Sequence, residues 1–229
     1  MTENEFEKRL NALEARIEHE EGIIEIKTIM NRYLQYFQGA DANNILQDWA
    51  FERDDCSVEL GRGKFQGERT IRLFFDQRPD LARLPGALVE HETTSQVVTI
   101  ADDGQTARFI AFSPGYKCLA PGHSQVWSLG RYYVEFIKIE GRWKIWHMQW
   151  AVIVEGDAAL GWLYQNRSYF KECLFPELDC IHRGDQNMIP ADNVIDHYKM
   201  DMVQYFLPEP PPPYKTWDKY NALFRTREY

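Results

Sequence analysis

The sequence predicts an α+β protein in which helices come first and a curved antiparallel sheet follows. Apolar side chains recur at helical spacing from residue 5 to about residue 38. Two strand patterns between residues 91 and 116 are joined at Asp102-Asp103-Gly104, a good turn sequence. Two longer strands between residues 127 and 155 are joined at Glu140-Gly141. A sheet wrapped on an N-terminal helix in this order forms a cone with one open end.

The predicted N-terminal helix has two parts. Apolar residues between positions 10 and 17 follow a heptad-like spacing, which Glu20-Glu21 interrupts. An apolar stripe resumes from Ile23 to Phe37, and Gly39 is a suitable stop. Because the first part is short for a stable free helix, we expect it to pack on the body or on a second subunit.

Shorter elements link this helix to the sheet. The sequence predicts a short helix from Asp41, its cap, to Trp49, a strand from Cys56 to Leu60, and a helix from Glu68 to Asp76. Pro79 and Pro85 end that last helix and lead to the strand that begins at His91.

The pattern changes after residue 156. Residues 1–156 contain the predicted cone, and residues 157–229 form a long irregular extension in which only 157–170 and 191–205 suggest helices. The run from Leu207 to Tyr214 is rich in proline and must be extended as polyproline II. It is either a ligand for an SH3-type domain or an arm laid on this subunit or its neighbour, and the flanking aromatic residues favour the arm.

Composition excludes several classes of partner. The formal charge of −9, without a cluster of Lys and Arg, argues against nucleic acid and against an anionic membrane surface. The charged opening and the lack of a long apolar run predict no signal peptide and no membrane span, hence a cytoplasmic location. The four cysteines form no Cys-x-x-Cys pair, so we expect them to be reduced and structural.

The hairpin between residues 127 and 155 provides the candidate site. If its strands pair symmetrically about Glu140-Gly141, one face carries a few polar tips in an apolar field, as the floor of a small-molecule pocket does. A core with a satisfied histidine has the same pattern. The opposite face, with Trp146 and Trp150, is the predicted subunit contact. The cross-strand pairs on the pocket face are then Tyr132 with Gln149, Val134 with His147, and Phe136 with Ile145.

Three stretches together resemble a known family. They read IIEIKTIMNRYLQYFQG, GKFQGERTIRLFF and GRYYVEFIKIEGRWKIWHMQW, and they are similar to the SnoaL-like branch of the nuclear transport factor 2-like superfamily. The resemblance covers roughly residues 8 to 155, and its opening particularly resembles bile-acid 7α-dehydratase. It implies a cone-shaped barrel with an internal pocket, a homodimer or higher homo-oligomer, and chemistry without a cofactor. The family also contains non-catalytic binders, so fold analogy leaves the function open.

The functional residues of this family carry over in part. The tyrosine of the dehydratase matches Tyr33, and the histidine at the start of the third strand has a counterpart in His91. Gln38 replaces a frequent acidic residue, and Val134 stands where many relatives carry Asp. The dehydratase arginine falls near Val152 and is absent. A different group must therefore supply the base if this chain is an enzyme.

Proton abstraction next to a carbonyl needs a base and an oxyanion donor in a dry cavity. We hypothesise that His147 and His91 transfer protons and that Tyr33 polarises a substrate oxygen. No metal site is predicted, since the two candidate motifs, His182-x-x-Asp185 and Asp196-His197, lie in irregular sequence. Aromatic lining favours an apolar polycyclic or aromatic ligand, and the predicted substrate contacts are Trp49, Phe109, Trp127, Tyr132 and Gln149.

Two functions fit this cavity. The first is a cofactor-independent lyase or isomerase, meaning a dehydratase, a double-bond isomerase or a cyclase. The second is a non-catalytic small-molecule-binding or assembly protein of the same fold. The absent acid and arginine favour the second function, whereas the polar tips of Tyr33, His91 and His147 favour the first.

Overall fold

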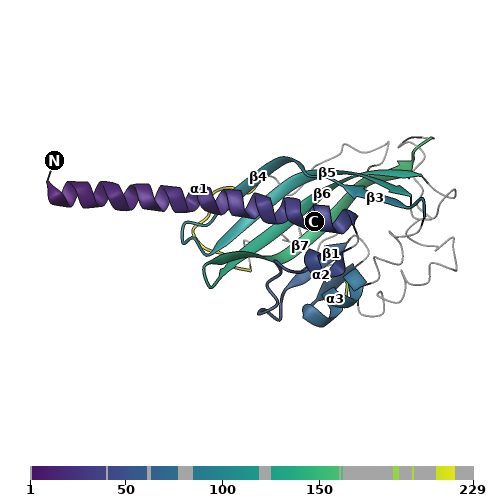
Figure 1. The fold of residues 1–229 in the computed structure, drawn as a ribbon, viewed down its shortest axis with the longest axis horizontal. Helices are drawn as coiled ribbons and strands as arrows, with labels where there is room; N and C mark the ends of the chain where they lie inside the picture. Colours follow the sequence, from purple (N-terminus) through teal and green to yellow (C-terminus); the bar gives the residue numbers. More distant parts are fainter. Residues whose placement is uncertain are drawn as a thin grey trace.

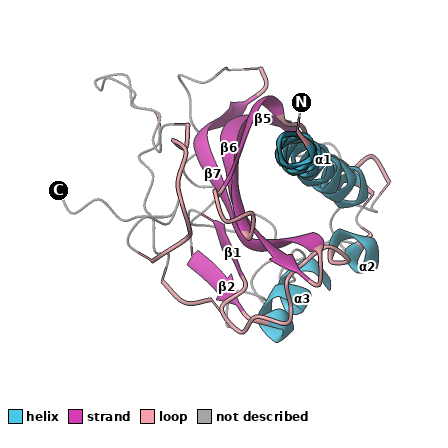
Figure 2. Cartoon of the chain, turned by 90° about the vertical axis from the view of Figure 1, so that its left-hand side faces the viewer, coloured by secondary structure: helices cyan, strands magenta, loops and turns pink. Residues whose placement is uncertain are grey.

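The computed structural model has one long helix, α1 (Glu3–Gln38), on the concave side of a strongly curved sheet, as Figures 1 and 2 show. This arrangement confirms the predicted α+β class. The structure describes residues 2–39, 41–60, 63–76, 85–118, 125–159, 161, 188–190, 198 and 210–219.

The sheet has seven strands in the order β2-β1-β7-β6-β5-β3, and β4 also pairs with β5. All neighbours are antiparallel except β1 and β7, which run parallel, so the sheet is mixed. After α1, the elements are α2 (Ala42–Ile45), β1 (Ser57–Leu60), β2 (Gly63–Gln66), α3 (Glu68–Asp76), β3 (Leu88–His91), β4 (Thr94–Ile100), β5 (Thr106–Cys118), β6 (Val126–Ile139) and β7 (Arg142–Asp157).

The predicted N-terminal helix forms as a single element. Thr2 and Glu5 make a capping box in which each side chain accepts a hydrogen bond from the backbone of the other. The side chains before Gly22 are exposed, so the first part of α1 buries no side chain on the described body, and Glu18 ties it to the sheet through an ion pair of 2.7 Å with Lys138 of β6. A Cβ at Gly22 would lie 2.9 Å from Ile100, which explains why the helix meets the sheet at a glycine.

Two shorter predictions need correction. The helix predicted from Asp41 to Trp49 covers only Ala42–Ile45, and Trp49 instead forms a bridge with Ile145 of β7. The strand predicted from residue 91 is interrupted, so His91 ends β3 instead of starting a long strand.

The register of the long hairpin changes at a bulge. Glu140 and Gly141 take positive φ values of 50° and 78°, as a tight hairpin turn requires, and Phe136 pairs with Ile145 as predicted. The next pair is Glu135 with His147, so Trp146 is an extra residue in β7. A one-residue shift moves every following side chain to the other face.

The predicted pairs beyond the bulge are therefore wrong. Tyr132 pairs with Trp150, and Val134 pairs with Met148. His147 and Gln149 turn to the convex face. Trp150, predicted at a subunit contact, faces the concave side with Tyr132.

Part of the C-terminal extension lies on the sheet. The backbone N–H of Asp102 donates to the carbonyl of Tyr214 over 2.9 Å, and the Thr99 hydroxyl donates to the carbonyl of Pro211 over 3.0 Å. The helices suggested for 157–170 and 191–205 lie almost wholly outside the described residues, as do Cys173 and Cys180. No helix in the described part of the chain has the length and apolar character needed to cross a membrane.

A candidate acid-base site on the concave face

Aromatic side chains fill the middle of the concave face. Trp49, Phe109 and Tyr132, three of the predicted substrate contacts, are at most 2% exposed and belong to the main core. Tyr33 reaches this cluster from α1, with its ring 6.2 Å from the ring of Tyr132 and 5.7 Å from that of Phe37. The Tyr33 side chain is therefore surrounded by apolar rings.

His91 joins the same cluster from the end of β3. Its ring is 3% exposed and lies edge-on to Phe37 at 5.3 Å and to Trp150 at 4.7 Å. The side-chain amide of Gln38 donates to the His91 carbonyl over 3.2 Å and so ties β3 to the last turn of α1. Since Phe37 contacts both rings, Tyr33 and His91 lie in one aromatic cluster.

Two strand glycines make room for this site. A Cβ at Gly115 would lie 2.8 Å from Nδ1 of His91 and 2.9 Å from Oγ of Ser128. A Cβ at Gly130 would lie 3.0 Å from Nε1 of Trp150. Glycine within a strand often marks such a close approach, a signal in the sequence that our prediction did not use.

A buried ion pair completes the polar part of the site. Nζ of Lys117 donates to Oε1 of Glu155 over 2.5 Å, and it lies 5.1 Å from the centre of the Trp150 ring. Glu155 is 6% exposed and pairs across the strands with Ser128, which is next to His91. Oε2 of Glu155 accepts no hydrogen bond from the described residues. The sequence prediction omits Glu155 because a glutamate near a strand end is usually solvated.

His147 lies on the convex face, away from Tyr33 and His91. Its Nδ1 is 2.8 Å from Oε2 of Glu135, and its ring stacks on Trp146 at 4.2 Å. Nε1 of Trp217 also donates to Oε2 of Glu135, over 3.0 Å. Oε1 of the same carboxylate is 4.0 Å from Nε of Arg108. The structure thus separates the predicted histidine pair.

The remaining predicted substrate contacts also lie on the convex side. The side-chain amide of Gln149 donates to Oε1 of Glu59 over 3.0 Å, and both residues are buried. Trp127 is half-buried and alternates with Ser128, which faces the concave side. Both residues therefore lie on the face of the sheet opposite Tyr33.

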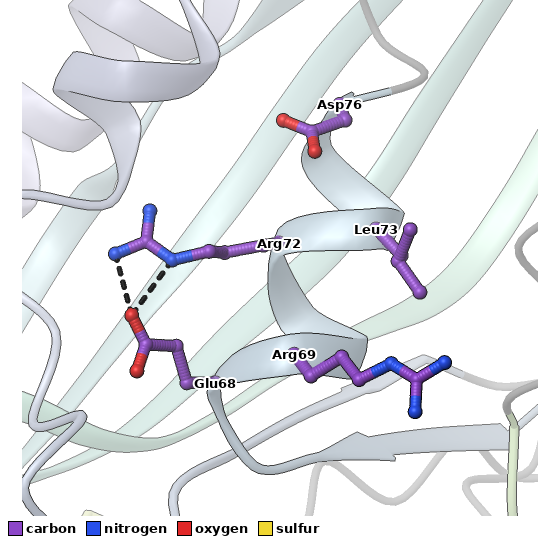
Figure 3. A pocket seen from close by; sticks show the side chains of 5 residues that line it. All are labelled: Glu68, Arg69, Arg72, Leu73 and Asp76. Atoms are coloured by element: carbon purple, nitrogen blue, oxygen red, sulfur yellow. Dashed lines mark hydrogen bonds and ion pairs between the residues drawn. The ribbon is translucent and has the colours of Figure 1, made fainter.

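Two surface hollows are distinct from this site. One, of about 740 Å³, lies between α1 and the β6–β7 turn, where Arg32 and Asp48 form an ion pair of 2.7 Å. The other, of about 440 Å³, lies beside α3 (Figure 3), and Arg72 and Glu68, which form an ion pair of 2.7 Å, are part of its lining. Its lining is solvent-exposed and consists of Glu68, Arg69, Arg72, Leu73 and Asp76.

A family model for the SnoaL-like domain matches residues 19–149, which is more than half of the chain. The chain belongs to the SnoaL-like domain family. A search of curated protein sequences found no match. The SnoaL-like match begins just before α1 reaches the sheet and stops short of Glu155, so the projecting part of α1 and the C-terminal extension lie outside it.

Solved structures share the fold of this SnoaL-like domain at low identity. A protein provisionally named scytalone dehydratase, from Novosphingobium aromaticivorans, has a TM-score of 0.54 at 11% identity, over 66% of this chain and 97% of its own. The hexachlorocyclohexane dehydrochlorinase LinA-type3 of Novosphingobium barchaimii has a TM-score of 0.53 at 14% identity, over 63% of this chain and 94% of its own. A protein of unknown function from Mycobacterium tuberculosis has a TM-score of 0.53 at 15% identity, over 75% of this chain and 93% of its own.

Among the described residues of this SnoaL-like domain, no group of three or more His, Cys, Asp and Glu side chains is arranged to hold a metal ion. The concave face carries the imidazole of His91, the phenol of Tyr33 and the lysine-bound carboxylate of Glu155. These are groups that move protons and stabilise an oxyanion.

Proposed function

We propose that this SnoaL-like protein is a cofactor-independent lyase or isomerase that acts on an apolar polycyclic or aromatic molecule at the concave face. One observation carries the proposal: His91 lies in an aromatic cluster with Tyr33, and Trp150 contacts both the His91 ring and the ammonium of Lys117, which pairs with buried Glu155. A few polar groups in an apolar field are what a small-molecule site requires.

His91 is the proposed proton-transfer group. An imidazole takes up and releases a proton near neutral pH, and the surrounding rings keep water away from it. Removal of the proton next to a substrate carbonyl gives an enolate, whose oxygen the Tyr33 hydroxyl stabilises by donating a hydrogen bond. A dehydratase then expels hydroxide, which leaves as water after protonation. An isomerase returns the proton to a more distant carbon and shifts the double bond.

Glu155 is the proposed substitute for the acidic residue that Val134 replaces. Lys117 holds one of its oxygens, and the other accepts no hydrogen bond from the described residues. That second oxygen is suited to accept a hydrogen bond from a substrate hydroxyl or to act as a second base. Its position beside Ser128, next to His91, supports a shared role.

The names of related structures support elimination as the reaction class. Both a dehydratase and a dehydrochlorinase remove a leaving group and a proton from neighbouring carbons, and both names occur among the proteins that share this fold. The likeness of the N-terminal stretch to bile-acid 7α-dehydratase favours a steroid-like substrate.

A non-catalytic ligand binder is the second candidate function. The observation that favours it is the filled middle of the concave face, where Phe109 and Phe136 have no exposed surface and Trp49 has 2%. This filling confines any ligand to the end of the sheet near His91.

Turnover assays on matched histidine variants test the proposal. The panel consists of polycyclic β-hydroxyketones and β,γ-unsaturated ketones without a cofactor, because both give a conjugated enone with strong ultraviolet absorbance. We expect His91→Gln to lower kcat/KM about 10²- to 10⁴-fold, the contribution of general acid-base catalysis. His147→Gln, on the convex face, should retain kcat/KM within about threefold of wild type.

Two results would count against this assignment. Full activity in His91→Gln, with loss in His147→Gln, would move the chemistry to the convex face. The second result is that no ketone is turned over, but one of them quenches the tryptophan fluorescence of the wild type and not that of His91→Gln. This result would favour the ligand binder.

A further inference from the structure

The first part of α1 projects beyond the body of the protein, as Figure 1 shows. The side chains from Glu3 to Glu21 are exposed, and Gly22 is the first buried residue of the helix. At 1.5 Å per residue, this projection is about 28 Å long. A helical segment of this length has little stability in water without a packing partner.

The projecting segment carries an apolar stripe. Large apolar residues recur along it at spacings of four, three, four and seven, which place them at the a and d positions of a heptad. In a lone helix, apolar side chains at these positions are exposed to water, which is unfavourable. A partner helix stabilises them by burying their apolar surface. The stripe consists of Phe6, Leu10, Leu13, Ile17 and Ile24, which are between 44% and 64% exposed.

The stripe faces away from the sheet. Gly22, Ile26 and Ile29 lie on the buried side of α1. Ile24 follows Gly22 by two residues, about 200° around the helix, and is 64% exposed. A second helix can therefore lie along the stripe up to Ile24 without meeting the sheet.

Charges beside the stripe specify the partner. The e positions hold Glu7, Glu14 and Glu21, and the g positions hold Arg9 and Arg16. In a parallel pair of identical helices, each g residue faces the e residue five positions later in the other copy, so Arg9 meets Glu14 and Arg16 meets Glu21. In an antiparallel pair, arginine would face arginine and glutamate would face glutamate.

We propose that this stripe binds a second copy of the chain in a parallel two-stranded coiled coil from about Phe6 to Ile24. The two bodies then lie at the same end of the coil, on its outer sides, and leave both concave sites accessible. Glu20 occupies a d position, where it meets Glu20 of the second copy and limits the affinity. This surface is independent of the proposed reaction.

The oligomeric state of the full chain tests the surface. Sedimentation equilibrium should give a wild-type dimer at micromolar concentration and a monomer for Leu13→Asn/Ile17→Asn. Both side chains are exposed, so the urea midpoint of the body should stay unchanged and exclude misfolding. A monomeric wild type, or a variant that remains a dimer, would overturn the proposal.

Crosslinking and charge reversal test the orientation. In a parallel coil, residue 10 of one copy faces residue 10 of the other. Leu10→Cys should therefore form an intermolecular disulfide faster than Asn11→Cys, because residue 11 lies on the outer side of the coil. Arg16→Glu should raise the dimer Kd about fivefold, because the symmetric dimer loses two ion pairs. Lys8→Glu, at an outer position, should change it less than twofold. Equal crosslinking of the two cysteine variants, or equal effects of the two reversals, would overturn the parallel arrangement.

Discussion

Glu135 on the convex face and Glu155 on the concave face are both buried carboxylates, but their surroundings differ. Glu135 receives the Trp217 indole, contacts His147 and lies near Arg108, and it is 1% exposed. Glu155 has Lys117 on one oxygen and no partner among the described residues on the other. A carboxylate surrounded by donors holds structure together, whereas one with an available acceptor suits a site that receives a ligand.

The same difference separates the two histidines. His147 is held by Glu135 and stacks on Trp146 under the C-terminal segment 210–219. His91 touches the rings of Phe37 and Trp150 next to the space that Gly115 leaves. His147 is fixed in a charge cluster, which suits a role in stability. His91 lies among apolar rings, which suits the chemistry that we propose for the concave face.

Removing the convex carboxylate should have the largest effect on stability. In Glu135→Ala, the buried Arg108 and the half-buried His147 lose this carboxylate, and we expect the free energy of unfolding to fall by about 3–5 kcal/mol. Urea denaturation measures the change. The control Glu92→Ala, at an exposed glutamate, should stay within about 0.5 kcal/mol of wild type. An unchanged midpoint together with lost turnover would reverse the roles of the two faces.

Filling the space beside His91 should have an intermediate effect. In Gly115→Ala, the new methyl group meets Nδ1 of His91 at 2.8 Å and the Glu90 carbonyl at 3.0 Å, so the site must shift. We expect a loss of about 1–3 kcal/mol in the free energy of unfolding and a drop in kcat/KM. Gly39→Ala is the control, since its methyl group would have no neighbour nearer than 3.7 Å. Unaltered kcat/KM in Gly115→Ala would show that the position of His91 does not matter.

The fold could be predicted from the sequence because its signals are local. Period-two alternation, the Glu140-Gly141 turn and the apolar stripe from Ile23 to Phe37 each depend on a few neighbouring residues. The pairing next to the turn, Phe136 with Ile145, is confirmed for the same reason.

The site was predicted only in part because bulges and long-range contacts leave little local trace. The extra residue Trp146 in β7 turned His147 away from the concave face. Gln149 followed it, whereas Trp150 turned inward. The partners of Glu155 come from β5 and β6, and no spacing in the sequence brings Lys117 and Ser128 to it. Tyr33 and His91 entered the candidate site through the family resemblance, which already contains such contacts, and their catalytic roles stay predictions.

The smallest predicted effect concerns the segment that covers the convex face and appears only at alkaline pH. Tyr214 lies 3.9 Å from the Arg108 guanidinium and hydrogen-bonds with Thr106 over 3.2 Å. Burial raises the pKa of the Tyr214 hydroxyl from 10.0 to about 12. The unfolded chain therefore loses this proton first, so Tyr214 contributes stability below pH 10 that is lost as the pH rises towards 12. Tyr214→Phe should flatten the fall in Tm between these pH values, as measured by differential scanning calorimetry. An equal fall in Tm for the wild type and Tyr214→Phe would show that Tyr214 leaves the convex face before its hydroxyl loses the proton. The segment 210–219 would then separate readily from the charge cluster around Glu135.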